Sequence, residues 1–499
     1  MPKRIAARLI DERLRAERGA IRKQAPLRVA LSYPSPYNVG MSSLGFQRIY
    51  RAIQETDGMT CERAFLPDDA AAGDVDEVPV TYESKTPLAA FGIVALSVAY
   101  ELELAGVIRL LELAGIPPLR EQRDERHPFI LAGGPLTFSN PVPLAPYADA
   151  VVVGEAEGII ADIIATIDGS ASKAAALAHL AARDHVFVPD HHGETLPAIA
   201  QCDDDLLPAW APIRTPHTEL SNMFLIETER GCSRGCTYCV MRRSTNGGMR
   251  IVPKERVLDA IPADAERVGL VGAAVSDHPK IVEIVRELAA RGCGVGLSSL
   301  RPDRLTDEFV GALKAGGYRT LTTAMDGASE RLRDSLERRA RVRHLERAAD
   351  LARAHGMDRL KLYLMVGLPD ETDADIDECV ELTTALSRRI PVSLGIAPFC
   401  AKRNTPLDGQ PFAGIDVVRG RLDRLRRGLK GKADVRSTSA RWAWVEYILA
   451  QGGAAEGRAV LDAVHAGGTF AAYRRAFAGL GSGRSEPRRS LPLMLEGEP

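Results

Sequence analysis

Residues 229–239 read Glu-Arg-Gly-Cys-Ser-Arg-Gly-Cys-Thr-Tyr-Cys, and three cysteines stand in this one short run. Cys232, Cys236 and Cys239 follow a CxxxCxxC spacing, which places three thiolates within a single loop. Soft thiolates are the ligands of iron–sulfur clusters. With three of them, one iron of a four-iron cluster keeps an open position, which suits chemistry on a bound ligand better than electron storage. The run therefore predicts a 4Fe-4S cluster held by these three cysteines.

A zinc site or three buried, inert thiols would also explain the triplet. A structural zinc ion needs a fourth ligand, and the nearest upstream histidine, His217, lies 15 residues before Cys232, beyond a predicted strand. The remaining cysteines are scattered and suit small buried side chains: Cys61, Cys202, Cys293, Cys379 and Cys400. Eight cysteines in so long a chain do not indicate a disulfide framework.

The composition bounds the class of protein. The 499 residues are enough for two or three domains, each with its own core. A formal net charge of −2 gives no general electrostatic reason to expect nucleic acid or an anionic membrane as partner. No apolar run approaches the roughly 20 residues that cross a bilayer, and residues 1–23 predict an amphipathic helix instead of a signal segment. We therefore expect a cytoplasmic protein that acts without a membrane or nucleic acid.

Residues 213–410 alternate short apolar runs with helical patterns, such as Pro279–Arg291 and Asp373–Leu386. This alternation predicts right-handed βα units around a parallel sheet, in an α/β fold of the (β/α)6 partial-barrel type. Active groups of such folds lie at the carboxyl ends of the strands. The predicted strands are Met223–Ile226, Val268–Gly272, Val295–Ser299, Thr320–Met325, Lys361–Val366 and Ser393–Ala397.

Residues 27–165 show a second alternating pattern, which predicts a doubly wound, Rossmann-like domain. The strand ends carry Ser97, the run Gly133-Gly134-Pro135 and the turn Gly154-Glu-Ala-Glu157. Ligands are expected at this carboxyl edge. The predicted strands are Leu27–Leu31, Ile93–Ser97, Phe129–Leu131 and Ala150–Val153.

Four further segments complete the predicted organisation. Residues 1–26 form a helical extension, and residues 166–212 a connector with a short helix and strand. Residues 411–480 have a helical pattern, whose basic face we interpret as solvated, and end in a small C-terminal cap on one side of the barrel. Residues 481–499 are rich in Gly, Ser, Arg and Pro and predict a disordered tail.

The cysteine triplet, with Tyr238 just before its last member, resembles the signature of the radical S-adenosylmethionine (SAM) superfamily. The resemblance implies that the open iron binds the amino and carboxylate groups of SAM. It further implies that the reduced cluster cleaves SAM to methionine and a 5′-deoxyadenosyl radical, which abstracts hydrogen from a substrate that the sequence does not identify. A reducing partner such as flavodoxin or ferredoxin is expected.

Several strand ends resemble the SAM-binding segments of that family. Gly272 and Ala273 stand where members often have a glycine-rich, GGE-like turn, although the acidic residue is missing here. Ser299 and Arg301 follow the third strand, and Arg301 could hold a carboxylate or form an ion pair. Asp326 replaces the glutamate of an "EAGSERLR"-type segment. The resemblance implies cofactor contacts for these residues and for Tyr238.

Two more segments identify the family without implying chemistry. Residues 364–373 resemble its "GLPGET" turn, which we interpret as structural. Residues 398–406 resemble a "PFxPKxxTP" segment, with Ala401 in place of the proline. Cys400 in this segment is interpreted as a buried bystander, with a hydrogen-transfer role as the alternative.

The N-terminal domain resembles the cobalamin (B12)-binding-like domain fused to many radical SAM enzymes, in its serine, its double glycine and its Gly-Glu turn. The DxHxxG motif is absent, and no histidine precedes His127. Either cobalamin binds without a histidine ligand, which would allow methyl transfer that consumes a second SAM, or the domain serves packing or substrate recognition. The remaining alternatives are a cobalamin-independent radical SAM enzyme and a non-catalytic 4Fe-4S sensor or electron carrier.

Overall fold

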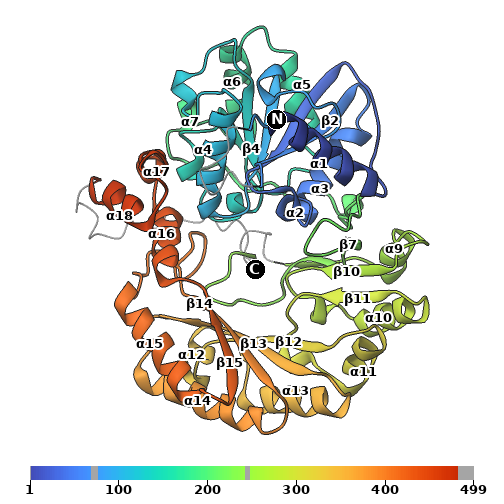
Figure 1. Ribbon diagram of the computed structural model, residues 1–499, viewed down its shortest axis with the longest axis vertical. Coiled ribbons are helices and arrows are strands. Elements are labelled where there is room, and N and C mark those ends of the chain that lie inside the picture. Colours follow the sequence, from blue (N-terminus) through green and yellow to red (C-terminus); the bar gives the residue numbers. More distant parts are fainter. Residues whose placement is uncertain (1, 69–76, 242–247, 481–499) are drawn as a thin grey trace, which may run out of the picture.

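The computed structural model describes residues 2–68, 77–241 and 248–480. An N-terminal domain lies above an open barrel, and the C-terminal helices run along one side of both (Figure 1). The tail predicted to be disordered, residues 481–499, lies outside the described residues. Among the helices of the described residues, none has both the length and the apolar character needed to cross a membrane.

The N-terminal domain is built on a six-stranded sheet in the order β2-β1-β3-β4-β5-β6. All neighbours pair in parallel except β5 and β6, which are antiparallel. The first five strands follow the 2-1-3-4-5 order of a doubly wound, flavodoxin-like sheet, so the predicted architecture is confirmed. The strands are β1 (Leu27–Tyr33), β2 (Met59–Phe65), β3 (Ile93–Ser97), β4 (Phe129–Gly133), β5 (Ala150–Val152) and β6 (Val186–Phe187).

Both faces of this sheet are buried because successive side chains of a strand point to opposite sides. Val29 and Leu31 belong to one core cluster, while Ala30 between them belongs to the other. Helices therefore cover the two faces. They are α1 (Pro2–Ala16), α2 (Tyr37–Gly40), α3 (Leu44–Glu55), α4 (Leu104–Leu113), α5 (Ile160–Asp168), α6 (Lys173–Ala181) and α7 (Pro189–His192).

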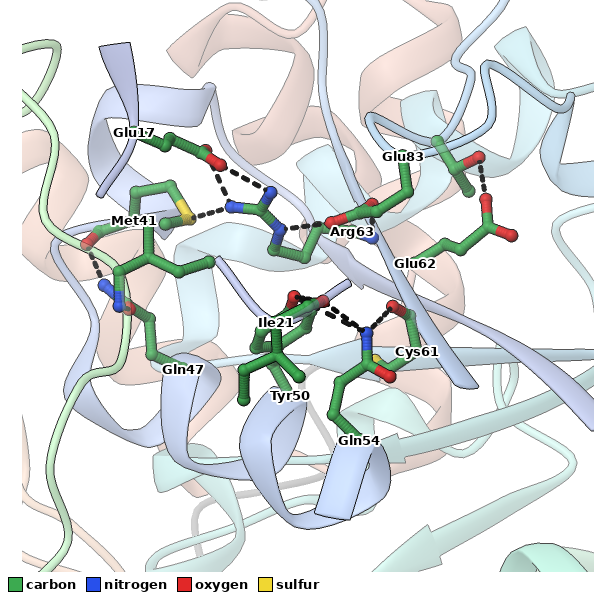
Figure 2. A network of polar contacts seen from close by, with 12 residues as sticks. Glu17, Ile21, Met41, Gln47, Tyr50, Gln54, Cys61, Glu62, Arg63 and Glu83 are labelled. Atoms are coloured by element: carbon green, nitrogen blue, oxygen red, sulfur yellow. Dashed lines mark hydrogen bonds and ion pairs between the residues drawn. The ribbon is translucent and has the colours of Figure 1, made fainter. Parts of the chain in front are cut away.

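Strand β2 was not predicted, because it contains two charged residues although every one of its residues is buried. Figure 2 shows how the charge of Arg63 is neutralised. The Arg63 guanidinium lies 2.8 Å from Glu17 of the N-terminal extension and 2.7 Å from Glu83 of the following loop. Glu62 accepts a 2.7 Å hydrogen bond from Arg28. The extension thus covers the edge strand, and a buried charge is tolerated because it is paired.

The barrel consists of parallel strands in two groups, β7-β10-β11 and β12-β13-β14-β15. A parallel bridge between Leu300 and Thr323 links the groups. All six predicted strands are confirmed, and β15 adds a seventh that was not predicted. The strands are β7 (Met223–Glu227), β10 (Arg267–Val271), β11 (Gly294–Leu297), β12 (Thr320–Asp326), β13 (Arg359–Val366), β14 (Val392–Pro398) and β15 (Ala433–Ser437).

The barrel helices lie outside the strands (Figure 1). They pack on the strand faces that carry Leu360, Leu362 and Leu364, which belong with them to one core. A short antiparallel hairpin, β8 (Glu229–Gly231) and β9 (Met249–Ile251), flanks the cysteine loop. The helices are α9 (Lys254–Asp259), α10 (Ile281–Ala290), α11 (Asp307–Ala315), α12 (Glu330–Ser335), α13 (Val342–Ala354), α14 (Asp373–Ser387) and α15 (Ile415–Gly428).

The C-terminal helices are α16 (Ala440–Gln451), α17 (Ala454–His465) and α18 (Phe470–Ala478). Their apolar residues join the core of the N-terminal domain, against the face of its sheet that α4 covers. The Asn140 side-chain amide donates to the carbonyls of Ala450, at 3.0 Å, and Gly452, at 2.8 Å. The predicted helical C-terminal region is thus confirmed, and it packs on the N-terminal domain as well as beside the barrel, whose core Ala440 joins.

The carboxyl ends of the two sheets face each other. Lys402, in the segment after β14, lies 2.7 Å from Glu101, which follows β3. Arg230 of β8 lies 2.8 Å from Glu157, which follows β5. These ion pairs join the two domains near the first and the penultimate strand of the open barrel, so the N-terminal domain spans the mouth of the barrel.

Candidate active site

The cysteine loop leaves the carboxyl end of β7 through the short strand β8. Cys232, Cys236 and Cys239 are free thiols of intermediate exposure. The Cys232 amide donates to the Gly248 carbonyl at 3.2 Å, and the Thr237 amide donates to the Leu336 carbonyl at 3.2 Å. The loop is therefore anchored to the base of the hairpin and to the segment after α12. Three partly buried thiols on one anchored loop fit a cluster that lacks a fourth protein ligand.

Burial raises the pKa of all three thiols, and that of Cys239 to about 11. Bound iron would therefore have to displace their protons, as metal binding to cysteine generally does. Among the described residues, no three His, Cys, Asp or Glu side chains form a group that could hold a single metal ion.

Arg338 is the residue next to the loop that the sequence did not reveal. Its Nε lies 2.5 Å from the Asp326 carboxylate, at the end of β12. Burial works against the charge of this arginine, but the nearby Asp326, Tyr238 and Cys236 outweigh it, so its pKa is raised. Arg338 also lowers the pKa of Cys236, which burial raises. One guanidinium thus connects a predicted cluster ligand with a predicted SAM contact.

Asp326 and Tyr238, both predicted as cofactor contacts, meet in this cluster. The pKa of Asp326 is raised, because the effect of burial outweighs the opposing effects of Arg338 and of a hydrogen bond from Tyr238. Asp326 has a φ of +63°, an uncommon conformation for a residue with a side chain, although aspartate tolerates it better than most. The structure therefore brings Tyr238, Asp326 and Cys236 together around one arginine.

The turn after β10, which carries the predicted cofactor contacts Gly272 and Ala273, lies against Glu229 of β8. A Cβ atom on Gly272 would lie 2.0 Å from Oε1 of Glu229, so glycine is required here by a neighbouring side chain of the same protein. The same oxygen accepts a 2.7 Å hydrogen bond from the Ala274 amide. Glu229 thus supplies a carboxylate where the turn itself has none. Ala273 beside it is exposed.

Glu229 is fully buried, and its Oε2 has no hydrogen-bond partner among the described residues. Burial raises its pKa to about 7. Glu229 belongs to the run that drew attention to the loop, and the missing acidic residue of the β10 turn was the signal that could have singled it out.

Arg301 was predicted to bind a carboxylate of the cofactor, and in the structure it contacts two carboxylates of this chain. Its guanidinium pairs with Asp277 and Asp303, and its side chain is almost fully buried. Asp277 also accepts a 2.8 Å hydrogen bond from Ser233 of the cysteine loop. Arg301 therefore positions the loop from the end of β11, while the predicted Ser299 beside it is exposed.

The Gly-Glu turn of the N-terminal domain contacts the barrel. Arg230 lies 3.2 Å from Glu155 and 2.8 Å from Glu157, and Arg250 of β9 lies 2.5 Å from Glu155. A Cβ on Gly154, whose φ is +99°, would lie 2.6 Å from the Ala200 backbone. In the turn that resembles a cofactor-binding element, the space beside Gly154 is therefore occupied by Ala200. The glutamates of the turn form ion pairs with the hairpin next to the cysteine loop.

The second contact between the domains surrounds Lys402. Its ammonium lies 2.7 Å from Glu101 and 2.8 Å from Glu446 of α16. Cys400, two residues earlier, donates to the Ala443 carbonyl at 3.1 Å. Burial raises the pKa of Cys400, so the thiol is neutral at physiological pH.

The inner face of β13 carries accessible side chains within the barrel. Its residues alternate between buried and accessible, and Lys361, Tyr363 and Met365 lie on the accessible side. The Lys361 ammonium stands 4.7 Å from the centre of the Tyr363 ring, which is 38% exposed. This side of β13 thus presents a cation and an accessible aromatic ring next to each other.

Comparison with known proteins places this site in a family. Residues 226–383, which include the cysteine loop and β10 to β13, match the model of the radical SAM superfamily. Residues 45–189 match the model of the N-terminal region of radical SAM proteins. The chain belongs to the radical SAM superfamily. It is therefore an enzyme, and a 4Fe-4S cluster and SAM are the cofactors of its family.

Two curated relatives match very different shares of the chain. The uncharacterized protein MJ0966 of Methanocaldococcus jannaschii is 28% identical over 402 residues, which are 77% of this chain and 80% of the relative. The threonylcarbamoyladenosine tRNA methylthiotransferase MtaB of Thermotoga maritima is 25% identical over 171 residues, which are 32% of this chain and 39% of the relative. The second match therefore concerns only part of either protein.

Among solved structures, the cobalamin-dependent SAM radical enzyme OxsB, with aqua-cobalamin and SAM bound, has a TM-score of 0.49 and 12% identity. The match covers 82% of this chain, which spans 58% of the length of OxsB.

Proposed function

We propose that this enzyme cleaves SAM reductively at a cluster on Cys232, Cys236 and Cys239 and uses the resulting radical to modify a substrate in the barrel lumen. The observation that carries the proposal is the set of three accessible thiols on one anchored loop at the carboxyl ends of the strands. When bound, the reduced cluster and SAM would supply a radical that removes hydrogen from an unactivated carbon. An electron carrier such as flavodoxin or ferredoxin would reduce the cluster.

The residues of this chain would have separate tasks in that reaction. Asp326 would accept hydrogen bonds from a polar group of SAM, with Arg338 holding the carboxylate in place. Glu229 would fix the β10 turn next to the loop through the Ala274 amide. Lys361 and Tyr363 would seat the substrate, and the N-terminal domain, fastened across the barrel mouth, would keep water away from the radical.

We propose that the reaction is complete without cobalamin. The Gly-Glu turn is filled by the chain and paired with Arg230 and Arg250, and the double glycine is joined to the end of β3 by a 2.8 Å hydrogen bond from the Val98 amide to the Gly133 carbonyl. Cobalamin-dependent methyl transfer is the second candidate. It is favoured by the flavodoxin-like strand order and by the carboxyl edge that faces the barrel.

Product analysis separates these candidates. Anaerobically reconstituted protein is given dithionite and SAM, with and without cobalamin, and nucleoside products are quantified by chromatography. We expect 5′-deoxyadenosine in both samples. S-adenosylhomocysteine that appears only with cobalamin would establish methyl transfer instead. An intact cluster that yields neither product, and whose spectrum does not respond to SAM, would contradict the proposed function.

A further inference from the structure

A pocket of about 280 Å³ lies on the cysteine loop, lined by residues that the proposed reaction does not use. Its walls are Ser233, Arg234 and Gly235 from the loop, Arg304 from the turn after β11, and Glu337 and Arg339 from the segment after α12. Ser233, Arg234 and Gly235 are the residues between Cys232 and Cys236. The pocket therefore touches the backbone that would carry two of the three cluster ligands.

The charge of the pocket is predominantly positive. Three guanidinium groups face one carboxylate, that of Glu337. Arg234 lies 2.8 Å from Asp303, and Arg304 lies 3.4 Å from Asp277, but Asp277 is buried at 3% exposure. The Arg304 side chain is 52% exposed, and Arg339 is exposed as well. The exposed charges of the pocket are thus the two arginines Arg304 and Arg339 and the single carboxylate of Glu337, which leaves positive charge in excess at the surface.

The backbone turns the neighbouring side chains of Arg338 and Arg339 in different directions, one inward and one to the surface. Glu337 and Arg339 both have positive φ angles, of 53° and 58°, which residues with side chains adopt rarely. Between them, Arg338 turns inward to Asp326, and its side chain is only 11% exposed. Arg339 turns outward to the pocket. The strained segment therefore places one positive charge beside the predicted cluster ligand Cys236 and another at the surface above it.

We propose that this arginine-lined pocket is the docking site for an acidic, flavodoxin-type electron carrier that reduces the cluster. The inference rests on the proposed function, since it requires a cluster on the adjacent loop. The step is a transfer of one electron from the reduced flavin to the oxidised cluster, in which no bond forms or breaks. Half-exposed guanidinium groups suit the surface carboxylates of a protein partner better than an enclosed small anion, and opposite charge mainly accelerates such encounters.

The test compares two reductants on the reconstituted, full-length protein. SAM cleavage is driven either by reduced flavodoxin or by dithionite, in wild type and in the double variant Arg304→Glu/Arg339→Glu. A matched control, Arg319→Glu/Arg436→Glu, reverses two arginines outside the pocket that are 79% and 78% exposed, each paired with one aspartate. The neutral variant Arg304→Ala/Arg339→Ala shows whether charge or shape matters.

We expect the flavodoxin-driven rate of the pocket variant to fall by roughly tenfold and to lose its dependence on salt. The dithionite-driven rate should stay within about twofold, the control should resemble wild type, and the neutral variant should lie between. Equal losses with both reductants would assign the pocket to the SAM or substrate site and overturn the proposal. No selective loss, or no reduction of wild type by flavodoxin, would overturn it as well. Failure of wild type with dithionite would contradict the proposed function itself.

Discussion

Both the N-terminal sheet and the barrel gather the carboxyl ends of parallel strands at one edge, but the two edges differ in what they contain. In the N-terminal domain, glutamates that follow the strands form ion pairs with arginine and lysine side chains of the barrel. In the barrel, the strand ends carry buried groups whose partners are incomplete, above all Glu229 with its free Oε2. A parallel sheet thus offers a ligand site at this edge in either case, and in the barrel the buried carboxylate of Glu229 lies next to the cysteine loop.

The largest expected effect comes from removing the barrel's candidate ligands. Cys236→Ala should abolish SAM cleavage to below detection, because two thiolates do not retain the cluster needed for the reaction. Anaerobic iron analysis and 5′-deoxyadenosine assays measure both properties. Cys400→Ala, another thiol of intermediate exposure near a strand end, should retain both. Loss of the cluster in both variants would mean that iron is not held specifically by the loop.

The next prediction breaks the contact between the two edges. Arg230→Leu leaves Glu157 and Glu227 without this guanidinium, while Glu155 keeps Arg250, and an uncompensated buried charge costs about 3–5 kcal/mol. Urea denaturation should show this loss in the free energy of unfolding. Arg126→Leu removes an ion pair whose arginine is 85% exposed, and should leave the free energy of unfolding almost unchanged because solvent screens the pair. Equal effects of the two variants would show that the contact between the domains is not buried in solution.

A third prediction concerns how the stability of the protein depends on pH through Glu229, whose Oε2 has no hydrogen-bond partner among the described residues. Its pKa of about 7 lies above the ordinary value of 4.5, so the folded state binds this proton more tightly than the unfolded state. The resulting stabilisation is complete below about pH 4.5 and is lost as the pH rises through about 7. Glu229→Gln cannot ionise. Between about pH 5 and pH 8, wild type should therefore lose about 2 kcal/mol more stability than the variant. Parallel pH profiles would contradict the assignment.

The smallest expected effect concerns the arginine between the edge of β12 and the loop. Arg338→Gln removes the charge that holds Asp326 and should lower kcat/KM for SAM cleavage by roughly tenfold while iron content stays normal. The electron paramagnetic resonance change that SAM induces in the reduced cluster should also weaken. Arg331→Gln, which removes an exposed arginine paired with Asp375, should change neither property.

Most of the fold was predictable because parallel strands buried on both faces form continuous apolar runs, as Ile93–Ser97 does. Two strands broke that rule. Strand β2 buries Arg63, whose partners Glu17 and Glu83 are distant in the sequence. Strand β15 is a half-exposed edge strand with alternating charges, so it has no apolar run to find. Neither the ion-pair partners of Arg63 nor the position of β15 at the edge of its sheet can be read from the neighbouring sequence.

The site was predictable where residue type alone suffices, as for the closely spaced cysteines, whose role as ligands stays a prediction. It was less predictable where a role depends on neighbours. Arg301 has the chemistry to hold a cofactor carboxylate, but Asp277 and Asp303 already occupy it. Arg338 follows a helix, with no motif around it, and gains its place only because the chain folds back toward Asp326.

The packing of the C-terminal helices against the N-terminal sheet has a consequence for how the protein is made. Because α17 and α18 complete one face of a core to which β1 contributes, the N-terminal domain is finished only after the barrel that follows it in the chain. The whole barrel must be synthesised, and its chain returned, before the N-terminal sheet is covered on both sides. During translation the unfinished sheet would expose apolar surface, so the nascent chain would depend on chaperones until its final helices emerge.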